Sequence, residues 1–203
     1  MKKIALLFLL NWPVAQLFSQ LSVSPIAGAN ITKVRFTEGP FKSDVALWYL
    51  IGMQAAYGIS ERVSGGLGLH YSVKGYNEDG KGPTLLSKSR LQYMEAMPFV
   101  EFHPLPSMGL LAGVGVGYLA NESYKENGDW HEPAFELAEK WDISAMLGAR
   151  YYFNHAFLAL TFNHSIASVL DYRYIDNEGE VAGKTYNQVL MFAVGYNFHL
   201  KKK

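Results

Sequence analysis

The sequence predicts an all-β fold, an eight-stranded antiparallel up-and-down barrel that spans a membrane. Eight segments alternate apolar residues with small or polar ones over ten or more positions, and a period of two is that of an extended strand. Segments of this length match the roughly 9 to 11 residues with which a tilted strand crosses a bilayer, whereas soluble strands average about five to six. The connections between the segments also alternate between short and long, as in outer-membrane barrels.

The first element, residues 1–20, has the pattern of a cleaved signal peptide. Lys2 and Lys3 precede the apolar run Ile4 to Leu10, which is much shorter than the roughly 20 residues of a membrane-spanning helix. We therefore predict export through the periplasm, with cleavage between Ser19 and Leu21. Residues 21–203 then form one outer-membrane β-barrel domain, located in the outer membrane of a Gram-negative bacterium.

The remaining elements are eight strands joined by two kinds of connection. The predicted strands are 23–35, 45–58, 63–76, 89–103, 108–120, 140–153, 156–168 and 186–200. Short turns fall at 59–62, 104–107 and 154–155, and long polar loops at 36–44, 77–88, 121–139 and 169–185. Because the strand number is even, both termini are expected on the short-turn, periplasmic side.

Each strand has two unlike faces. Since a membrane sheet can have no unpaired edge, the barrel must close. The alternate residues that include Leu, Val, Phe and Tyr should face lipid, and the small or polar residues between them, called here the lumen parity, should face the lumen. This is the reverse of a soluble lipocalin-type barrel. Aromatic residues near strand ends suit the girdles at the membrane interfaces: Tyr49, Tyr57, Tyr118, Trp141 and Tyr151.

Composition excludes several classes of function. The 18 Lys and Arg residues are balanced by 18 Asp and Glu, which argues against a nucleic-acid partner. The absence of cysteine excludes disulfides, thiolate metal sites and a cysteine nucleophile. The six histidines are scattered, so we expect no metal site and no cofactor.

Five charged residues fall on the lumen parity: Lys74, Glu95, Glu101, Asp142 and Arg150. An eight-stranded barrel is about wide enough for its own side chains to fill, so buried charges need partners. We expect an ion-pair network that plugs the interior; the alternative is a narrow polar path or a small-ligand site. Glu95 and Glu101 lie about 20 Å apart along one strand, too far for a glycosidase carboxylate pair.

Short motifs over most of the chain resemble the PorT-like family of Bacteroidetes-type outer-membrane barrels. They are Tyr71–Gly75 (Tyr-Ser-x-Lys-Gly), Leu91–Glu95 (Leu-x-Tyr-Leu-Glu), Gly113–Leu119 and Asp142–Tyr151, the last with Arg150 in place of a glycine. The family's proline comes one residue late here, at Pro98, which suggests a bulge or shifted pairing in the fourth strand. The resemblance implies a non-enzymatic protein, structural or accessory to transport or secretion.

The last strand also resembles the insertion signal of barrel proteins, with Gly195, Phe198 and Leu200 at the expected spacing. This resemblance implies the barrel-assembly machinery as a partner during insertion. In the third long loop, Tyr124, Trp130 and Phe135 are candidates for recognising a secretion or envelope protein or a glycan, and the alternative is aromatic packing over the barrel mouth.

Two alternative functions stay open. The first is a narrow passive pore for small solutes, and the second is a lipid-modifying enzyme, which would need a His-Ser arrangement. His164 and Ser165 are adjacent on a strand and point to opposite faces, so they cannot share a proton. His70 and Ser72 share a face, where we expect a simple hydrogen bond between them. We therefore favour a protein that is not an enzyme and whose main partner is outer-membrane lipid.

Overall fold

The computed structural model describes residues 21–38, 43–78, 86–126, 128–133, 138–176 and 179–199, and the predicted signal peptide lies outside them. Within these residues the regular elements are all strands. No helix in this part of the chain is long and apolar enough to cross a membrane.

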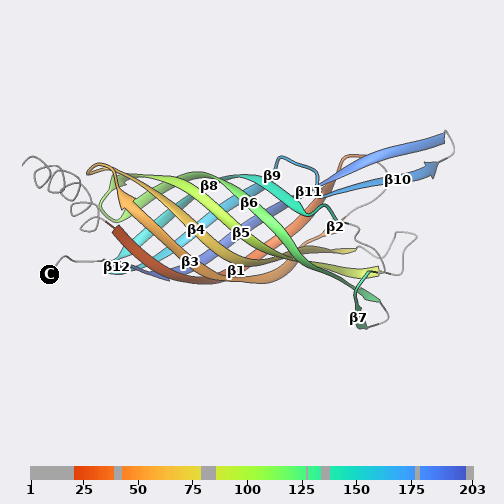
Figure 1. The fold of residues 1–203 in the computed structure, drawn as a ribbon, viewed down its shortest axis with the longest axis horizontal. Helices are drawn as coiled ribbons and strands as arrows, with labels where there is room; N and C mark the ends of the chain where they lie inside the picture. The colour runs from red at the N-terminus through yellow and green to blue at the C-terminus, as the bar shows by residue number, and fades with distance from the viewer. Residues whose placement is uncertain are drawn as a thin grey trace, which may run out of the picture.

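Eight long strands form a closed antiparallel ring, as the sequence predicts (Figure 1). They are β1 (Leu21–Phe36), β3 (Ala46–Gly58), β4 (Val63–Glu78), β5 (Leu86–Leu105), β6 (Met108–Glu126), β8 (Trp141–Phe153), β9 (Ala156–Ser165) and β11 (Gly179–Tyr196). Each pairs with the next along the chain, and β11 pairs with β1 to close the barrel. Short strands β2 (Ser43–Asp44), β7 (Asp129–His131), β10 (Leu170–Asp176) and β12 (Phe198–His199) extend it.

The strands are staggered around the ring. A path that follows paired residues once around the ring starts at Ser22 of β1 and returns to β1 at Thr32, ten residues further on. The residues between are Ala56, Gly66, Phe99, Gly113, Met146, Asn163 and Val189. A stagger of this kind accompanies tilted strands in a closed barrel and fixes which side chains meet inside it.

Two of the long connections are more ordered than the sequence predicts. In the expected loop 121–139, β6 continues to Glu126 and turns back as β7. In the expected loop 169–185, β10 pairs with the first part of β11 in a hairpin that projects from the loop end of the barrel (Figure 1). Gly128 and Gly179 have φ of 99° and 132°, which only glycine adopts readily, so both turns depend on them.

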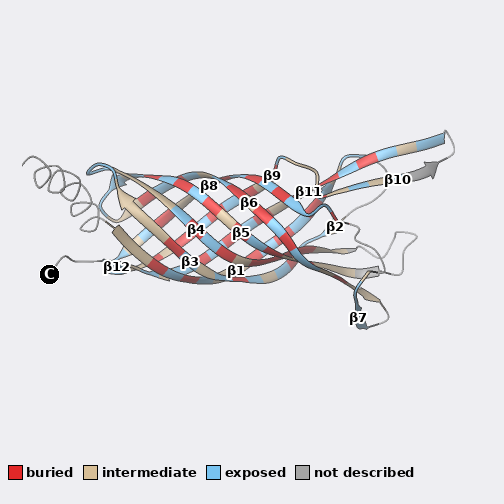
Figure 2. Ribbon diagram, in the orientation of Figure 1, coloured by how far each residue is buried: buried red, intermediate tan, exposed pale blue. Residues whose placement is uncertain are grey.

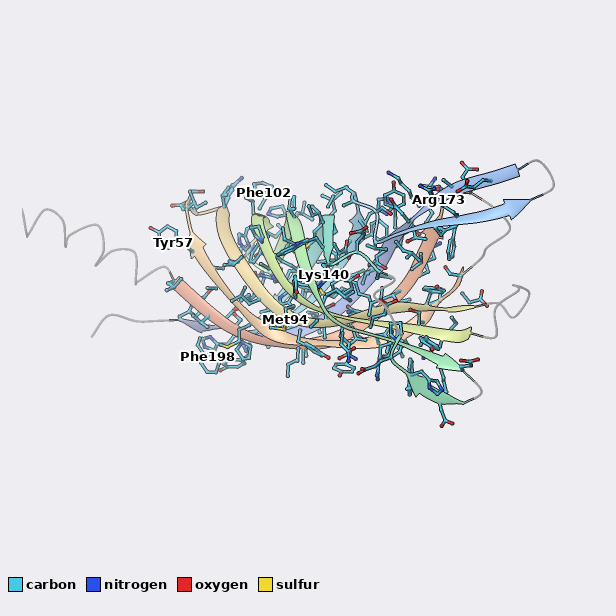
Figure 3. All side chains as sticks on the ribbon, turned by 45° about the vertical axis from the view of Figure 1, so that its right-hand side comes forward. Tyr57, Met94, Phe102, Lys140, Arg173 and Phe198 are labelled. Carbon is cyan, nitrogen blue, oxygen red and sulfur yellow. The ribbon has the colours of Figure 1, made fainter. Side chains whose placement is uncertain are left out.

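The burial pattern alternates along the strands and confirms the predicted faces (Figure 2). Large apolar side chains point outward, such as Leu47 (67% exposed) and Leu147 (65%), which suits lipid rather than water. Outward aromatic residues gather near both ends of the strands. Tyr57, Phe102 and Phe198 mark the short-turn end, opposite Arg173 at the loop end (Figure 3).

The bulge or shifted pairing expected in the fourth strand does occur in β5, but not at Pro98. The β5–β6 register is the same on both sides of Met97 and Pro98, and only their own ladder pairs are missing, as expected for a proline without an N–H. One shift lies earlier in β5, where Gln92 and Tyr93 face Asn121 and Leu119 and leave Ala120 as the extra residue of β6. The displaced proline therefore interrupts the ladder without moving it.

Candidate functional site

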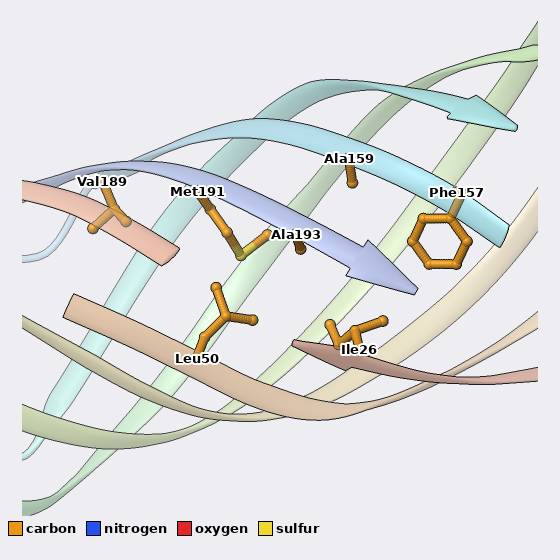
Figure 4. Close-up of a cluster of buried hydrophobic side chains, with 7 residues drawn as sticks. All are labelled: Ile26, Leu50, Phe157, Ala159, Val189, Met191 and Ala193. Atoms are coloured by element: carbon orange, nitrogen blue, oxygen red, sulfur yellow. The ribbon is translucent and has the colours of Figure 1, made fainter. Parts of the chain in front are cut away.

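Side chains fill the lumen in layers along the barrel axis. The middle layer is apolar and consists of two clusters of buried side chains: Ile26, Leu50, Phe157, Ala159, Val189, Met191 and Ala193 (Figure 4), and Met97, Phe99, Leu111 and Met146. The sequence interpretation assigned only small or polar residues to the lumen, so this apolar layer is a correction. Glycines of the wall make room for it, since a Cβ on Gly195 would lie 2.2 Å from the Phe157 ring.

A first charged cluster lies in the lumen toward the loop end. The Lys74 Nζ is 2.6 Å from Glu95 Oε1 and 2.7 Å from Asp142 Oδ2, and all three side chains are buried. Asp142 also accepts hydrogen bonds from Asn187 Nδ2 (2.9 Å) and Ser165 Oγ (2.5 Å). One ammonium therefore bridges two carboxylates, and one of these is further held by two neutral donors.

A second charged cluster lies toward the short-turn end. Arg150 Nη1 donates to Glu101 Oε2 (2.9 Å), and its Nη2 donates to Gln54 Oε1 (3.0 Å). The Tyr152 hydroxyl donates to Glu101 Oε1 (2.6 Å), and the Arg150 guanidinium lies 4.4 Å from the Phe157 ring centroid. The cluster combines an ion pair with an aromatic contact, and a guanidinium can make both at once, the first through its in-plane N–H groups and the second through its face.

The structure thus places the five charged residues of the lumen in two groups rather than one network. Of their neutral partners, Gln54, Tyr152 and Asn187 were not singled out from the sequence, and Ser165 was considered only beside His164. The signal was present, because Tyr152 and Asn187 lie on the lumen parity of their strands. What alternation cannot give is the stagger, which decides which lumen residues of different strands meet.

The expected hydrogen bond between His70 and Ser72 is absent. Ser72 instead accepts from Asn30 Nδ2 (2.9 Å), and neither ring nitrogen of His70 has a hydrogen-bond partner among the described residues. His70 lines a cavity of about 20 Å³ in the apolar layer, together with Met97, Phe157 and other members of the two clusters. Such a cavity is large enough for about one water molecule.

A serine–histidine contact does occur elsewhere, at the short-turn mouth of the barrel, which the sequence predicts to be periplasmic. Ser64 Oγ lies 3.3 Å from His103 Nε2, at a polar cavity of about 260 Å³ that Glu101 and Arg150 also line. The sequence reading missed this pair because the two residues come from different strands. The neighbouring carboxylate, Glu101, bonds to Arg150 and Tyr152.

The other predicted residues are scattered. His164 stacks beside Phe162 and Tyr186, while Ser165 points into the lumen, so the two do occupy opposite faces. Trp130 lies on β7 with its ring 6.1 Å from that of Trp48, and Tyr124 packs against His131 at 5.8 Å. Gly195 lies in the barrel wall, and Phe198 is exposed on β12. Phe135 and Leu200 fall outside the described residues.

A closed eight-stranded ring with an apolar exterior, two aromatic-lined ends and a filled interior defines an integral outer-membrane barrel. The model of the family described as outer membrane protein beta-barrel domain matches residues 14–171. The chain belongs to this family, which places it in the outer membrane of a Gram-negative cell. The comparison with curated proteins found no match.

Solved structures show the same fold at low sequence identity. Neisserial surface protein A has a TM-score of 0.54 at 15% identity, covering 87% of this chain and 97% of its own. The attachment invasion locus protein Ail of Yersinia pestis has a TM-score of 0.53 at 14% identity, covering 88% and 99%. OprG of Pseudomonas aeruginosa has a TM-score of 0.50 at 15% identity, covering 89% and 97%. At these identities the likeness concerns the fold alone.

Proposed function

We propose that this protein is a non-enzymatic, non-conducting barrel that acts structurally or as an accessory to transport or secretion, through the part that projects beyond the membrane. One observation carries the proposal: the lumen is closed by successive layers of packed side chains. The Arg150 cluster, the apolar middle and the Lys74 cluster follow one another along the axis.

A further apolar group supports closure at the loop end. Leu91, Tyr93, Leu119 and Ala138 form a buried cluster, and the Tyr93 ring centroid lies 4.9 Å from Lys74 Nζ. In the middle layer the cavity of about 20 Å³ is far smaller than a hydrated ion would need. A continuous aqueous path would require several of these buried side chains to move together.

The loop end supports a role at the cell surface. The β5 and β6 strands have 20 and 19 residues, about twice the length that crosses a bilayer, so their upper parts stand outside it. The β6–β7 and β10–β11 hairpins extend this exposed rim, and exposed rims on a rigid scaffold are where barrels carry variable recognition surfaces. The likeness of Tyr71–Gly75 and Asp142–Tyr151 to PorT-like motifs supports membership of that branch.

The polar cavity at the periplasmic mouth favours a second candidate, the narrow pore, because it hydrates one end of the lumen. Planar bilayer recording with purified, refolded protein separates the two. We expect no discrete conductance steps at moderate voltage, and reproducible steps would refute the closed lumen and support the pore. Folding of each sample is checked by the mobility difference between boiled and unboiled protein on a gel.

The non-enzymatic part of the proposal has its own test. Ser64 and His103 form the contact most similar to a nucleophile and base, yet Glu101 is engaged elsewhere and does not orient the imidazole. We expect His103→Ala and His70→Ala to leave the lipid A profile of the host envelope unchanged when compared by mass spectrometry. A changed acylation or phosphorylation pattern in the His103 variant would show an enzyme.

A further inference from the structure

Two cations and two tryptophans form a compact group on the barrel at the loop end, called here the Trp–cation cluster: Trp48, Lys88, Arg90 and Trp130. The two tryptophan ring centroids are 6.1 Å apart. Lys88 Nζ lies 4.3 Å from the Trp48 ring centroid, and the Arg90 guanidinium lies 4.4 Å from that of Trp130. Each cation is thus held against the face of an indole.

The fold brings these residues together from three strands. The β3–β4 pairing runs from Gly58–Ser64 up to Leu50–Ser72, and Trp48 lies just above this last pair. Beyond it Asn30 and Thr32 of β1 donate to the carbonyls of Val73 and Gly75 in β4. The β7 strand folds back on β6 and delivers Trp130 beside Arg90 of β5.

Within the described residues, no carboxylate forms an ion pair with either cation of the cluster. Arg90 Nε donates to Ser123 Oγ (3.0 Å), a neutral partner. Neither Lys88 nor Arg90 is in an ion pair with a carboxylate among the described residues, unlike Arg173, which pairs with Glu180 at 3.2 Å. Trp48 Nε1 is buried and also lacks a hydrogen-bond partner in this part of the chain.

The cluster lies where the lipid-facing surface ends. Along the outer face of β5, Val100 and Met94 are 53% and 56% exposed and apolar, and the same face continues through Gln92 to Arg90 and Lys88. Where this face changes from apolar to polar residues, the Tyr71 hydroxyl donates to Gln92 Oε1, and the Tyr49 and Tyr71 ring centroids are 6.3 Å apart. This order of apolar, tyrosine and cationic residues is that of a membrane interface.

We infer that the Trp–cation cluster binds a phosphate group of an outer-leaflet glycolipid of the lipid A type, whose acyl chains lie on the apolar face below. Lysine and the free N–H groups of arginine are the donors suited to phosphate oxygens, and the indoles hold both cations in place. A lipid is favoured over a soluble anion because the cationic site and the acyl-chain surface are continuous on one strand. The inference is independent of the proposed function.

The test measures binding of bisphosphorylated lipid A to the refolded protein in detergent micelles by native mass spectrometry. The cluster variant carries both Lys88→Gln and Arg90→Gln. It is compared with a control pair that carries both Lys33→Gln and Arg35→Gln. The control pair has the same spacing and sits exposed at the loop end of β1, over no aromatic ring in the described part of the chain. We expect the cluster variant to bind about tenfold or more weakly, as for loss of a hydrogen bond between charged groups, and the control to bind as the parent does.

Further binding measurements identify the group of the lipid that is bound and the contribution of the tryptophans to binding. Dephosphorylated lipid A should bind the parent as weakly as bisphosphorylated lipid A binds the cluster variant, and Trp130→Leu should weaken binding by a smaller factor. Unchanged affinity of the cluster variant, an equal loss in the control pair, or full competition by inorganic phosphate at matched concentration would each overturn the inference. The unboiled gel mobility of every variant establishes that it is folded.

Discussion

Replacing Lys74 by methionine should destabilise the barrel severely. The ammonium lies within 2.7 Å of both Glu95 and Asp142, so its removal leaves two buried carboxylates facing each other without a cation. Removing one partner of a buried ion pair costs about 3–5 kcal/mol, which is a fall of roughly two to four powers of ten in the folding equilibrium constant. The fit of methionine in the same volume means that packing contributes little to this loss.

Urea titration in lipid vesicles, with the folded fraction read from unboiled gel mobility, measures the effect. Lys33→Met, on the exposed face of β1, is the control and should change stability by no more than about 0.5 kcal/mol. The triple variant Lys74→Met, Glu95→Gln, Asp142→Asn should regain most of the loss, because it removes the buried charges together. A Lys74→Met loss below about 1 kcal/mol, or no recovery in the triple variant, would refute the bridging role of the ammonium.

Three further variants probe the other layers by the same titration. Phe157→Ala should lose about 3–5 kcal/mol, because Phe157 is buried and supports Arg150; a loss under about 1 kcal/mol would mean that the apolar layer is loosely packed. Leu147→Arg, in the middle of β8 and 65% exposed, should cost about 2–4 kcal/mol in a bilayer, and a neutral effect would contradict lipid contact there. Gly109→Ala should cost about 1–3 kcal/mol, since its Cβ would lie 1.8 Å from Glu101 Oε1 and push the Glu101 carboxylate away from Tyr152 and Arg150; unchanged stability would show that Glu101 moves freely.

The sequence predicts the ring and its two faces well because lipid acts on every strand in the same way. Alternation from Trp141 to Phe153 identifies both the strand β8 and the side of it that meets the membrane, and the structure confirms both. The boundaries differ mainly at the loop end, where the pattern changes. Outside the bilayer, water satisfies backbone groups, so the hairpins β6–β7 and β10–β11 need no strict alternation and read as loops.

The interior is harder to predict because its residues are determined by their contacts with one another rather than by contact with lipid or water. Parity places Glu101 and Arg150 inside, but only the stagger of ten residues around the ring brings them within 2.9 Å. The same stagger sets Lys74 between Glu95 and Asp142 and leaves His70 without a hydrogen-bond partner among the described residues. A shift by two residues at any one strand would keep every face correct and still separate these pairs.

The layering of the lumen has a physical reason of its own. Each charged cluster needs neighbours that hold its geometry, and the apolar side chains between the clusters supply part of this support. Phe157 shows the link, because it belongs to the buried apolar cluster and its ring also lies under the Arg150 guanidinium. Ionic and apolar layers therefore stabilise each other, so that opening a path through the barrel would cost packing and unpaired charge together, and this coupling favours a closed lumen over a pore.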